Sequence, residues 1–178
     1  MESAQREMRR AYVNGAPGVF VSGLVWVVAG IVWSRFGTAT AFAVLFFGGM
    51  LIMPLAILIA RTVFGTPKSA SGHPLDRLAL ESTFFLFAAL LVGYAMLRSS
   101  PQSVFPLLAA LIGARYFVFR TIYGEWLYWL LAAVLVTIGA SALLTNVAWS
   151  INPALAFGFV ELLFAAALIR RCERVTTD

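Results

Sequence analysis

The sequence predicts an all-α membrane protein, a single transmembrane domain over residues 1–178 built as a bundle of six transmembrane helices. Two observations support this class. Hydrophobic residues make up 61% of the chain and charged residues 12%, whereas soluble domains average roughly 45–50% apolar and about 25% charged residues. The apolar residues also fall into six runs of 17 to 22 residues. At about 1.5 Å per residue such a run spans roughly 26–33 Å, the thickness of the hydrocarbon core.

Charged residues and turn-forming clusters separate the runs. Arg35-Phe36-Gly37 follows the first run, and Arg98-Ser99-Ser100-Pro101 follows the third. Only the connection between Arg61 and Arg77 is long, and it is rich in Gly, Ser and Pro. Pro54 and Pro106 fall inside runs, where we expect them to kink the helices. The expected helices lie at residues 17–34, 39–60, 78–97, 103–119, 126–145 and 153–169.

The basic residues predict how the chain is oriented in the membrane. Of the 13 lysines and arginines, two (Arg35 and Arg98) lie on one side, and Arg115 lies inside a run. The other ten share the side of both termini: Arg6, Arg9, Arg10, Arg61, Lys68, Arg77, Arg120, Arg170, Arg171 and Arg174. Because cytoplasmic segments are enriched in Lys and Arg, we expect a multi-pass protein of the inner (cytoplasmic) membrane with cytoplasmic N- and C-termini.

The same residues indicate the partners. A net charge of +5 would suggest nucleic acid if it formed a stripe on a soluble domain. Here the cations flank apolar runs, so we expect anionic lipid headgroups at the cytoplasmic face as partners and no nucleic acid. An aromatic belt at the membrane interfaces is expected from residues near the ends of the runs: Trp33, Trp126, Tyr128, Trp129 and Trp149.

The two halves of the sequence resemble each other. Pro17 opens the first run and Pro101 precedes the fourth, while Glu81 in the third run corresponds to Glu161 in the sixth. The alignment needs gaps. An odd number of spans in each half would place the halves in opposite orientation, as in the inverted repeats of transporters. The alternative is a likeness between apolar helices by composition alone.

Glu161 is the most informative polar residue. It lies eight residues after Pro153 and nine before Arg170, near the middle of the membrane. A central charge costs about 2.5–3.5 kcal/mol on insertion scales, so such a residue faces the protein interior. Small residues at helical spacing, typical of helix–helix contacts, share its face: Ala154, Gly158 and Ala165. Two interpretations remain open: a proton or cation site, or a buried polar tie between helices.

Arg115 lies five residues before Arg120, a depth from which an arginine side chain can reach the membrane surface. The alternative is an inward-facing Arg115 paired with Glu81, which lies at a matching depth four residues after Arg77. Such a pair would be architectural or a gate. Glu125 opens the fifth expected helix, where a carboxylate is favoured by the helix dipole.

Uncharged polar and aromatic side chains supply further candidates. Ser22 and Trp26 lie one turn apart in the first run, beside the small residues Gly18 and Ala29. Additional candidates for the lining of an internal site occur in later runs: Tyr94, Tyr116, Thr137 and Ser141.

The sequence lacks the residue patterns of the common catalytic sites. With Cys172 as the only cysteine and His73 as the only histidine, neither a disulfide within the chain nor a thiolate metal cluster is expected, and we expect no cofactor. A rhomboid-type serine protease needs a Gly-x-Ser-Gly sequence and a histidine on a helix. Here Val21-Ser22-Gly23 lies in the first run and His73 lies in an expected solvated loop, so the match fails at both residues. We therefore expect no enzyme.

In its helix count and its Gly- and Trp-rich first helix, the chain resembles small, uncharacterised bacterial six-helix integral membrane proteins of unassigned function. That resemblance implies the membrane fold and no activity. The residues themselves favour a transporter or channel for a small solute or ion, proton-coupled through Glu161. The alternative is a non-transporting protein that binds a lipid, another apolar ligand or a partner membrane protein. A homodimer is a further expectation.

Overall fold

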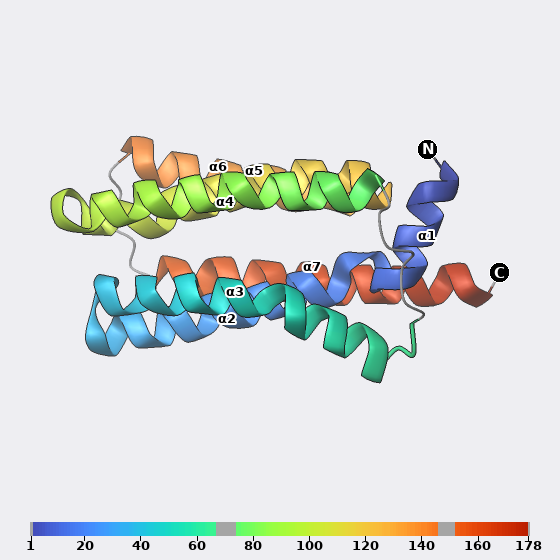
Figure 1. Ribbon diagram of the computed structural model, residues 1–178. Coiled ribbons are helices and arrows are strands. Elements are labelled where there is room, and N and C mark those ends of the chain that lie inside the picture. Colours follow the sequence, from blue (N-terminus) through green and yellow to red (C-terminus); the bar gives the residue numbers. More distant parts are fainter. Residues whose placement is uncertain (1, 67–73, 146–151, 178) are drawn as a thin grey trace.

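The computed structural model describes residues 2–66, 74–145 and 152–177, which form helices joined by short connections (Figure 1). Among these residues, six segments are long and apolar enough to cross a membrane, and each includes one of the helices α2 to α7, so the chain is a multi-pass membrane protein. The bounds are α1 (Glu2–Tyr12), α2 (Ala16–Phe36), α3 (Thr38–Thr62), α4 (Pro74–Ser99), α5 (Val104–Tyr123), α6 (Leu127–Thr145) and α7 (Pro153–Thr177), with 3-10 turns at Val13–Gly15 and Pro101–Ser103.

All six predicted spans are confirmed, and several helices are longer than predicted. Helix α4 begins at Pro74, four residues before the predicted start, and α7 continues to Thr177, eight residues past the predicted end. The predicted ends marked the limits of apolar sequence, whereas helices continue into polar sequence beyond the hydrocarbon core. Lys68, His73 and Trp149 lie outside the described residues.

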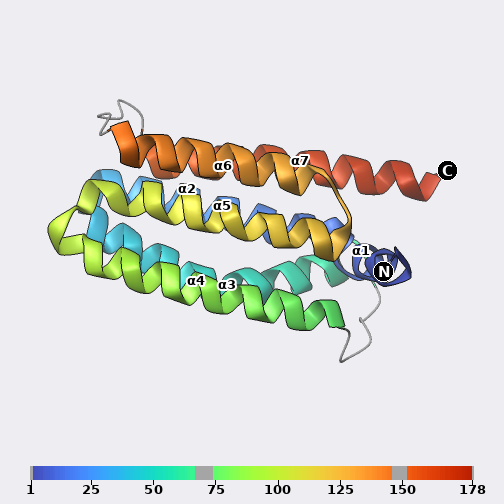
Figure 2. The same cartoon turned by 90° about the horizontal axis from the view of Figure 1, so that it is seen from above.

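The six spanning helices form two layers of three. Helices α4, α5 and α6 lie together in one layer, and α3, α2 and α7 lie together in the other (Figure 1). Viewed from above, α5 and α2 run through the middle, between α6 and α7 on one side and α3 and α4 on the other (Figure 2). The most extensive backbone contacts lie within the layers, where α5 packs on α4 and α6, and α2 packs on α3 and α7.

This packing has the pattern of an inverted repeat of α2–α4 and α5–α7. Helix α2 packs on the helix that follows it, and α5 does the same. Helix α2 also packs on α7, the third helix of the other half, while α5 packs on α4. Exchanging each helix for its counterpart leaves these pairings unchanged. Three spans in each half give the halves opposite directions across the membrane.

Glycines allow the close approach of helices within each layer. A Cβ on Gly158 of α7 would lie 2.9 Å from the carbonyl oxygen of Gly23 and 2.8 Å from the backbone nitrogen of Val27, both on α2. In the other layer, a Cβ on Gly139 would lie 2.6 Å from the carbonyl oxygen of Pro106. Small residues commonly permit such contacts in membranes. The predicted contact face of α7 is confirmed, because all four of its residues are buried: Ala154, Gly158, Glu161 and Ala165.

Asn152 fixes the start of α7 against the end of α2. Its Oδ1 accepts hydrogen bonds from the backbone N–H groups of Ala154 (3.1 Å) and Leu155 (3.3 Å), which satisfies donors that the helix leaves free. Its Nδ2 donates to the carbonyl oxygen of Gly30 at 2.7 Å. The side chain is therefore both a helix cap and a link between two helices.

Large aromatic side chains pack both within and between the layers. Trp26 of α2 packs edge-on against Phe157 of α7, with ring centroids 5.5 Å apart. It also meets Phe105 of α5 in the opposite layer, at 6.2 Å. All three rings are buried. The layers are thus held internally by close backbone packing and against each other by side chains.

The N-terminal helix α1 was not predicted. Met8 on its apolar face packs with Ile122 of α5 and Leu75 of α4, and Gln5 Nε2 donates to the carbonyl oxygen of Thr121 at 2.8 Å. Ala4, Met8 and Ala11 have helical spacing, but this apolar face is too short for a span. Helix α1 lies at the end of the bundle where α2 begins and α7 ends, here called the terminal end, and both chain termini lie there (Figure 1).

The two expected proline kinks have different outcomes. Pro54 lies inside α3, and Figure 1 shows the second half of α3 turning away from the neighbouring helices. The prediction of a kink at Pro106 is wrong, because α5 begins at Val104 and Pro106 lies in its first turn. Proline is tolerated there since that turn leaves backbone N–H groups without helical partners.

The contact between α2 and α7 can be tested by Gly158→Ala. The added methyl group meets backbone atoms of Gly23 and Val27, which cannot rotate away. We therefore expect a loss of about 1–3 kcal/mol in the free energy of unfolding, the usual range for overpacking. The measurement is thermal unfolding of the detergent-solubilised protein, followed by size-exclusion chromatography of the heated samples.

The matched control is Gly49→Ala, because a Cβ at this helical position of α3 meets no atom within 4 Å. That variant is expected to unfold at or slightly above the wild-type temperature, since alanine favours helix more than glycine does. A Gly158→Ala protein as stable as Gly49→Ala would contradict the close packing described above.

Candidate functional site

Glu161 lies at the centre of the bundle and is completely buried, with an exposed fraction of 0%. The hydroxyl of Tyr116, on α5, donates a hydrogen bond of 2.8 Å to its Oε1. Because Glu161 is on α7, this bond joins the two layers. The other carboxyl oxygen, Oε2, is buried and has no hydrogen-bond partner among the described residues. An unsatisfied buried polar atom costs about 1–3 kcal/mol, and the hydroxyl of Ser22 is the neighbouring group that can supply a donor to this carboxyl.

Helix α2 contributes two of the predicted site residues. The side chain of Ser22 is buried and lies beside both Glu161 and Tyr116. Trp26 follows one turn later and packs on Phe157, which lies one turn before Glu161 on α7. The structure thus brings Glu161, Ser22 and Trp26 together. Of the additional candidates with a hydroxyl group, Tyr116 is the one that contacts Glu161.

Arg115 is bound by hydroxyl groups and not by the expected carboxylate. Its Nε donates to Ser82 Oγ and its Nη2 donates to Thr83 Oγ1, both at 3.2 Å. The guanidinium also lies 5.0 Å from the centroid of the Phe119 ring. The expected pairing with Glu81 is wrong, because Glu81 is exposed on the outer face of α4. Adjacent helical residues point about 100° apart, so Ser82 facing α5 turns Glu81 away. Arg115 remains close enough to act electrostatically on Glu161.

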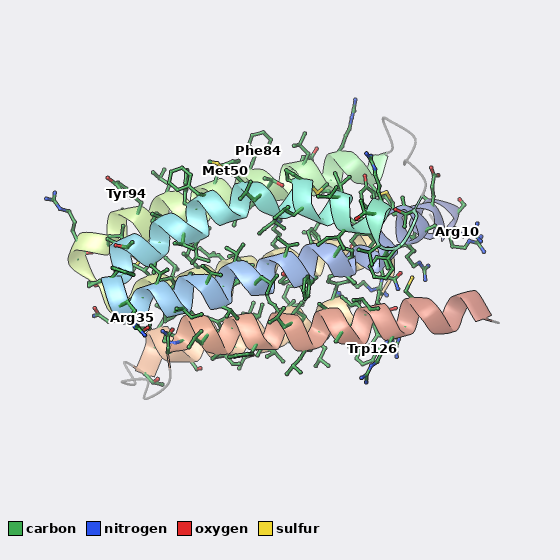
Figure 3. All side chains as sticks on the ribbon, turned by 90° about the horizontal axis from the view of Figure 1, so that it is seen from below. Arg10, Arg35, Met50, Phe84, Tyr94 and Trp126 are labelled. Carbon is green, nitrogen blue, oxygen red and sulfur yellow. The ribbon has the colours of Figure 1, made fainter. Side chains whose placement is uncertain are left out.

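Three further candidates do not line the interior. Tyr94 is 65% exposed, and Figure 3 shows its side chain pointing away from the bundle. Its ring meets Phe42 of α3 at 6.3 Å. Thr137 and Ser141 are also exposed on α6. Polarity alone made them candidates, and only the rotation of each helix decides which of them face inward.

Tyr128 is a buried residue whose position was predicted wrongly. The belt prediction grouped it with Trp126 and Trp129, which are indeed more than half exposed, but Tyr128 has an exposed fraction of 0%. Its hydroxyl donates to the carbonyl oxygen of Asn14 at 2.7 Å, and its ring stacks on that of Tyr116 at 6.0 Å. The sequence contained the signal, because Tyr128 shares helical spacing with the buried Leu131 and Leu135.

Glu125 lies at the terminal end of the bundle. It is buried in the turn before α6, and Arg171 of α7 donates to its Oε1 at 3.0 Å. The guanidinium of Arg171 also lies 5.1 Å from the centroid of the Trp126 ring. The carboxylate was expected to be structural at the start of a helix. The structure adds a link between the α5–α6 turn and α7.

Comparison with known families gives one match. The model of a family of unknown function (DUF7010) covers residues 1–171. This range includes α1 and every residue of the site around Glu161. No curated protein and no solved structure matches the chain. The chain therefore belongs to this family of unknown function, DUF7010.

Proposed function

We propose that the protein is a proton-coupled carrier of a small solute or ion, in which Glu161 binds and releases the coupling proton. The observation that supports this proposal is the state of the Glu161 carboxyl. It is fully buried between the two layers, one oxygen bonds to Tyr116 across the layer interface, and the other has no partner among the described residues. A group with these features responds to any movement that lets water or a solute reach it.

Loss of the proton would leave a charge in an apolar bundle, at a cost of several kcal/mol in this setting. Release of the proton is therefore favoured when the layers part and water enters. Conversely, the protonated carboxyl suits the closed bundle. Protonation and layer separation are coupled in this way, which is the requirement for a proton to drive transport.

The architecture supports movement of one layer against the other. Close glycine contacts such as Gly23 with Gly158 make each layer a compact unit. The contacts between the layers are made by side chains, with the Tyr116–Glu161 bond at the centre. Inverted repeats commonly produce alternating access by rocking of this kind around a site near the middle of the membrane.

A second candidate is a non-transporting protein that binds a lipid or a partner membrane protein. The apolar outer faces of α3 and α4 favour it, since Phe84 and Phe85 are 66% and 75% exposed and Figure 3 shows Met50 and Phe84 pointing outward. These faces suit lipid or a second copy of the chain in a homodimer. Under this alternative, Glu161 and Tyr116 only tie the layers together.

The carrier proposal is tested with Glu161→Gln in proteoliposomes that contain a pH-sensitive dye. The outside solution is made more acidic than the vesicle interior, and the interior is loaded with one ion at a time: Na⁺, K⁺, Mg²⁺ or chloride. We expect ion-dependent proton movement in the wild type. It should fall by roughly 10²-fold or more in the variant, as for other residues that transfer protons, because glutamine still accepts the Tyr116 hydrogen bond but cannot exchange a proton.

The matched control is Glu81→Gln, which removes an exposed carboxylate from α4 and should leave proton movement unchanged. Proton movement at the full rate in Glu161→Gln would instead assign this residue to the polar tie of the second candidate.

We also propose that the terminal end faces the cytoplasm of the cell and contacts anionic lipid headgroups. Arg10 and Arg35 lie at opposite ends of the bundle (Figure 3). The proposal is supported by exposed arginines in segments at the terminal end: Arg6, Arg10, Arg61, Arg77, Arg120, Arg170 and Arg171. Exposed cations of this kind are attracted to the anionic cytoplasmic leaflet.

Orientation is measured with single cysteines in a Cys172→Ser background. Ser3 of α1 and Ser99 at the end of α4 are exposed at opposite ends of the bundle. In intact spheroplasts, a membrane-impermeant maleimide should label Ser99→Cys at once and Ser3→Cys only after permeabilisation. The reverse labelling pattern would place the termini outside.

A further inference from the structure

Three tyrosines form a stacked column beside Glu161. The rings of Tyr116 and Tyr128 lie 6.0 Å apart with an interplanar angle of 26°, and those of Tyr128 and Tyr123 lie 5.6 Å apart at 23°. Tyr116 bonds to Glu161, whereas Tyr123 is the last residue of α5, at the terminal end. Along a helix these two residues are about 10 Å apart. The tyrosine column (Tyr116, Tyr128 and Tyr123) therefore leads from Glu161 to the terminal end.

The members of the tyrosine column differ in exposure. Tyr116 and Tyr128 are buried, with exposed fractions of 4% and 0%. Tyr123 at the end of α5 is half-buried. The column thus begins at a partly exposed tyrosine at the terminal end and ends at the carboxyl group, with a hydroxyl on each ring.

A strained turn holds the surface end of the column. Val13 and Asn14 have φ values of 51° and 55°, in the left-handed region that costs an L-residue about 1–2 kcal/mol. This conformation presents the Asn14 carbonyl oxygen to the Tyr128 hydroxyl at 2.7 Å. Gly15 follows with φ 75°, and a Cβ there would lie 2.6 Å from the Tyr123 ring. Strain maintained at one place is typical of functional positions.

The opposite side of Glu161 is apolar. Phe157 lies one turn from Glu161 toward the start of α7 and packs on Trp26 at 5.5 Å. Phe105 meets both Trp26 and, at 5.3 Å, Trp33. These four residues, the aromatic plug, pack closely between Glu161 and the end of the bundle opposite the termini. The surroundings of the carboxyl are therefore polar on one side and apolar on the other.

From this asymmetry, and resting on the proposed function, we propose that, while the layers are together, protons reach Glu161 from the terminal end, along the tyrosine column. The O–H bond of Tyr116 breaks as an O–H bond forms on the Glu161 carboxylate, and in the same concerted transfer the Tyr116 oxygen regains a proton from Tyr128 through an intervening water. Tyr128 regains one from Tyr123 and the solvent in the same way. The proton leaves Glu161 toward the opposite face when the layers part and water enters from that face.

The groups around the column suit this role. Arg115 on α5 acts electrostatically on Tyr116, Tyr123 and Glu161, so a cation stabilises the negative charge that appears on an oxygen during each transfer. Helix α2 contributes the neutral hydroxyl of Ser22 beside the carboxyl. Glu125, in the α5–α6 turn, disfavours negative charge on Tyr128, so Tyr128 must gain a proton as it gives one up.

The experiment follows protonation of Glu161 itself, using the full-length protein in lipid nanodiscs. Infrared spectroscopy detects the C=O stretching band of a protonated carboxyl group, and the band absent from Glu161→Gln identifies this residue. After a rapid drop in pH, Tyr128→Phe and Tyr116→Phe are expected to slow the growth of that band roughly 10-fold or more, because a proton-transferring side chain contributes at least this much. The pH midpoint of the band in Tyr128→Phe should stay at the wild-type value, which distinguishes a route from a structural effect.

Tyr94→Phe is the matched control, since it removes a hydroxyl from an exposed tyrosine of α4, and the band should grow at the wild-type rate. If both interior variants keep the wild-type rate, the route is overturned while Glu161 remains a proton site. If no band depends on Glu161, the proposed function itself fails. Tyr116→Phe leaves the Asn14–Tyr128 contact intact, so it tests the route even where Tyr128→Phe does not fold.

Discussion

The hydrogen bond from Tyr116 to Glu161 joins two layers of helices at the centre of an apolar bundle. A carboxyl group is costly at this depth, and the surrounding structure fits that constraint. Gly158 and Gly23 bring α7 close to α2, which turns Glu161 toward the opposite layer and away from lipid. Trp26 and Phe157 pack against each other on one side, and Tyr116 supplies a donor on the other. The position of Glu161 beside Tyr116 therefore depends on the close packing of α7 against α2.

The layers do not coincide with the two halves of the repeat. Each layer contains the first two helices of one half and the third helix of the other, so the described helices change layer after α3 and again after α6. These two crossings are equivalent in the repeat. Because each layer mixes the two halves, the contacts within a layer also join one half to the other.

The six spans follow from sequence because a bilayer leaves the backbone few alternatives to a long apolar helix. The inward direction of Glu161 was also predictable, since Ala154, Gly158 and Ala165 define the contact face of α7. Helix α1 was missed because it is amphipathic and short. The expected Arg115–Glu81 pair and the position of Tyr128 were wrong for a different reason: depth can be read from sequence position, but partners depend on how each helix is rotated. Tyr116 could not be distinguished from Tyr94 for the same reason.

The two halves share a pattern of helix pairings, yet their polar chemistry differs. In the repeat, α4 and α7 are counterparts, but α7 directs a carboxylate to Tyr116 whereas α4 directs the hydroxyls of Ser82 and Thr83 to Arg115. Glu81, the sequence counterpart of Glu161, faces outward. Glu161 consequently has hydroxyl groups on one side and aromatic rings on the other, and its counterpart Glu81 offers no matching carboxyl to the interior.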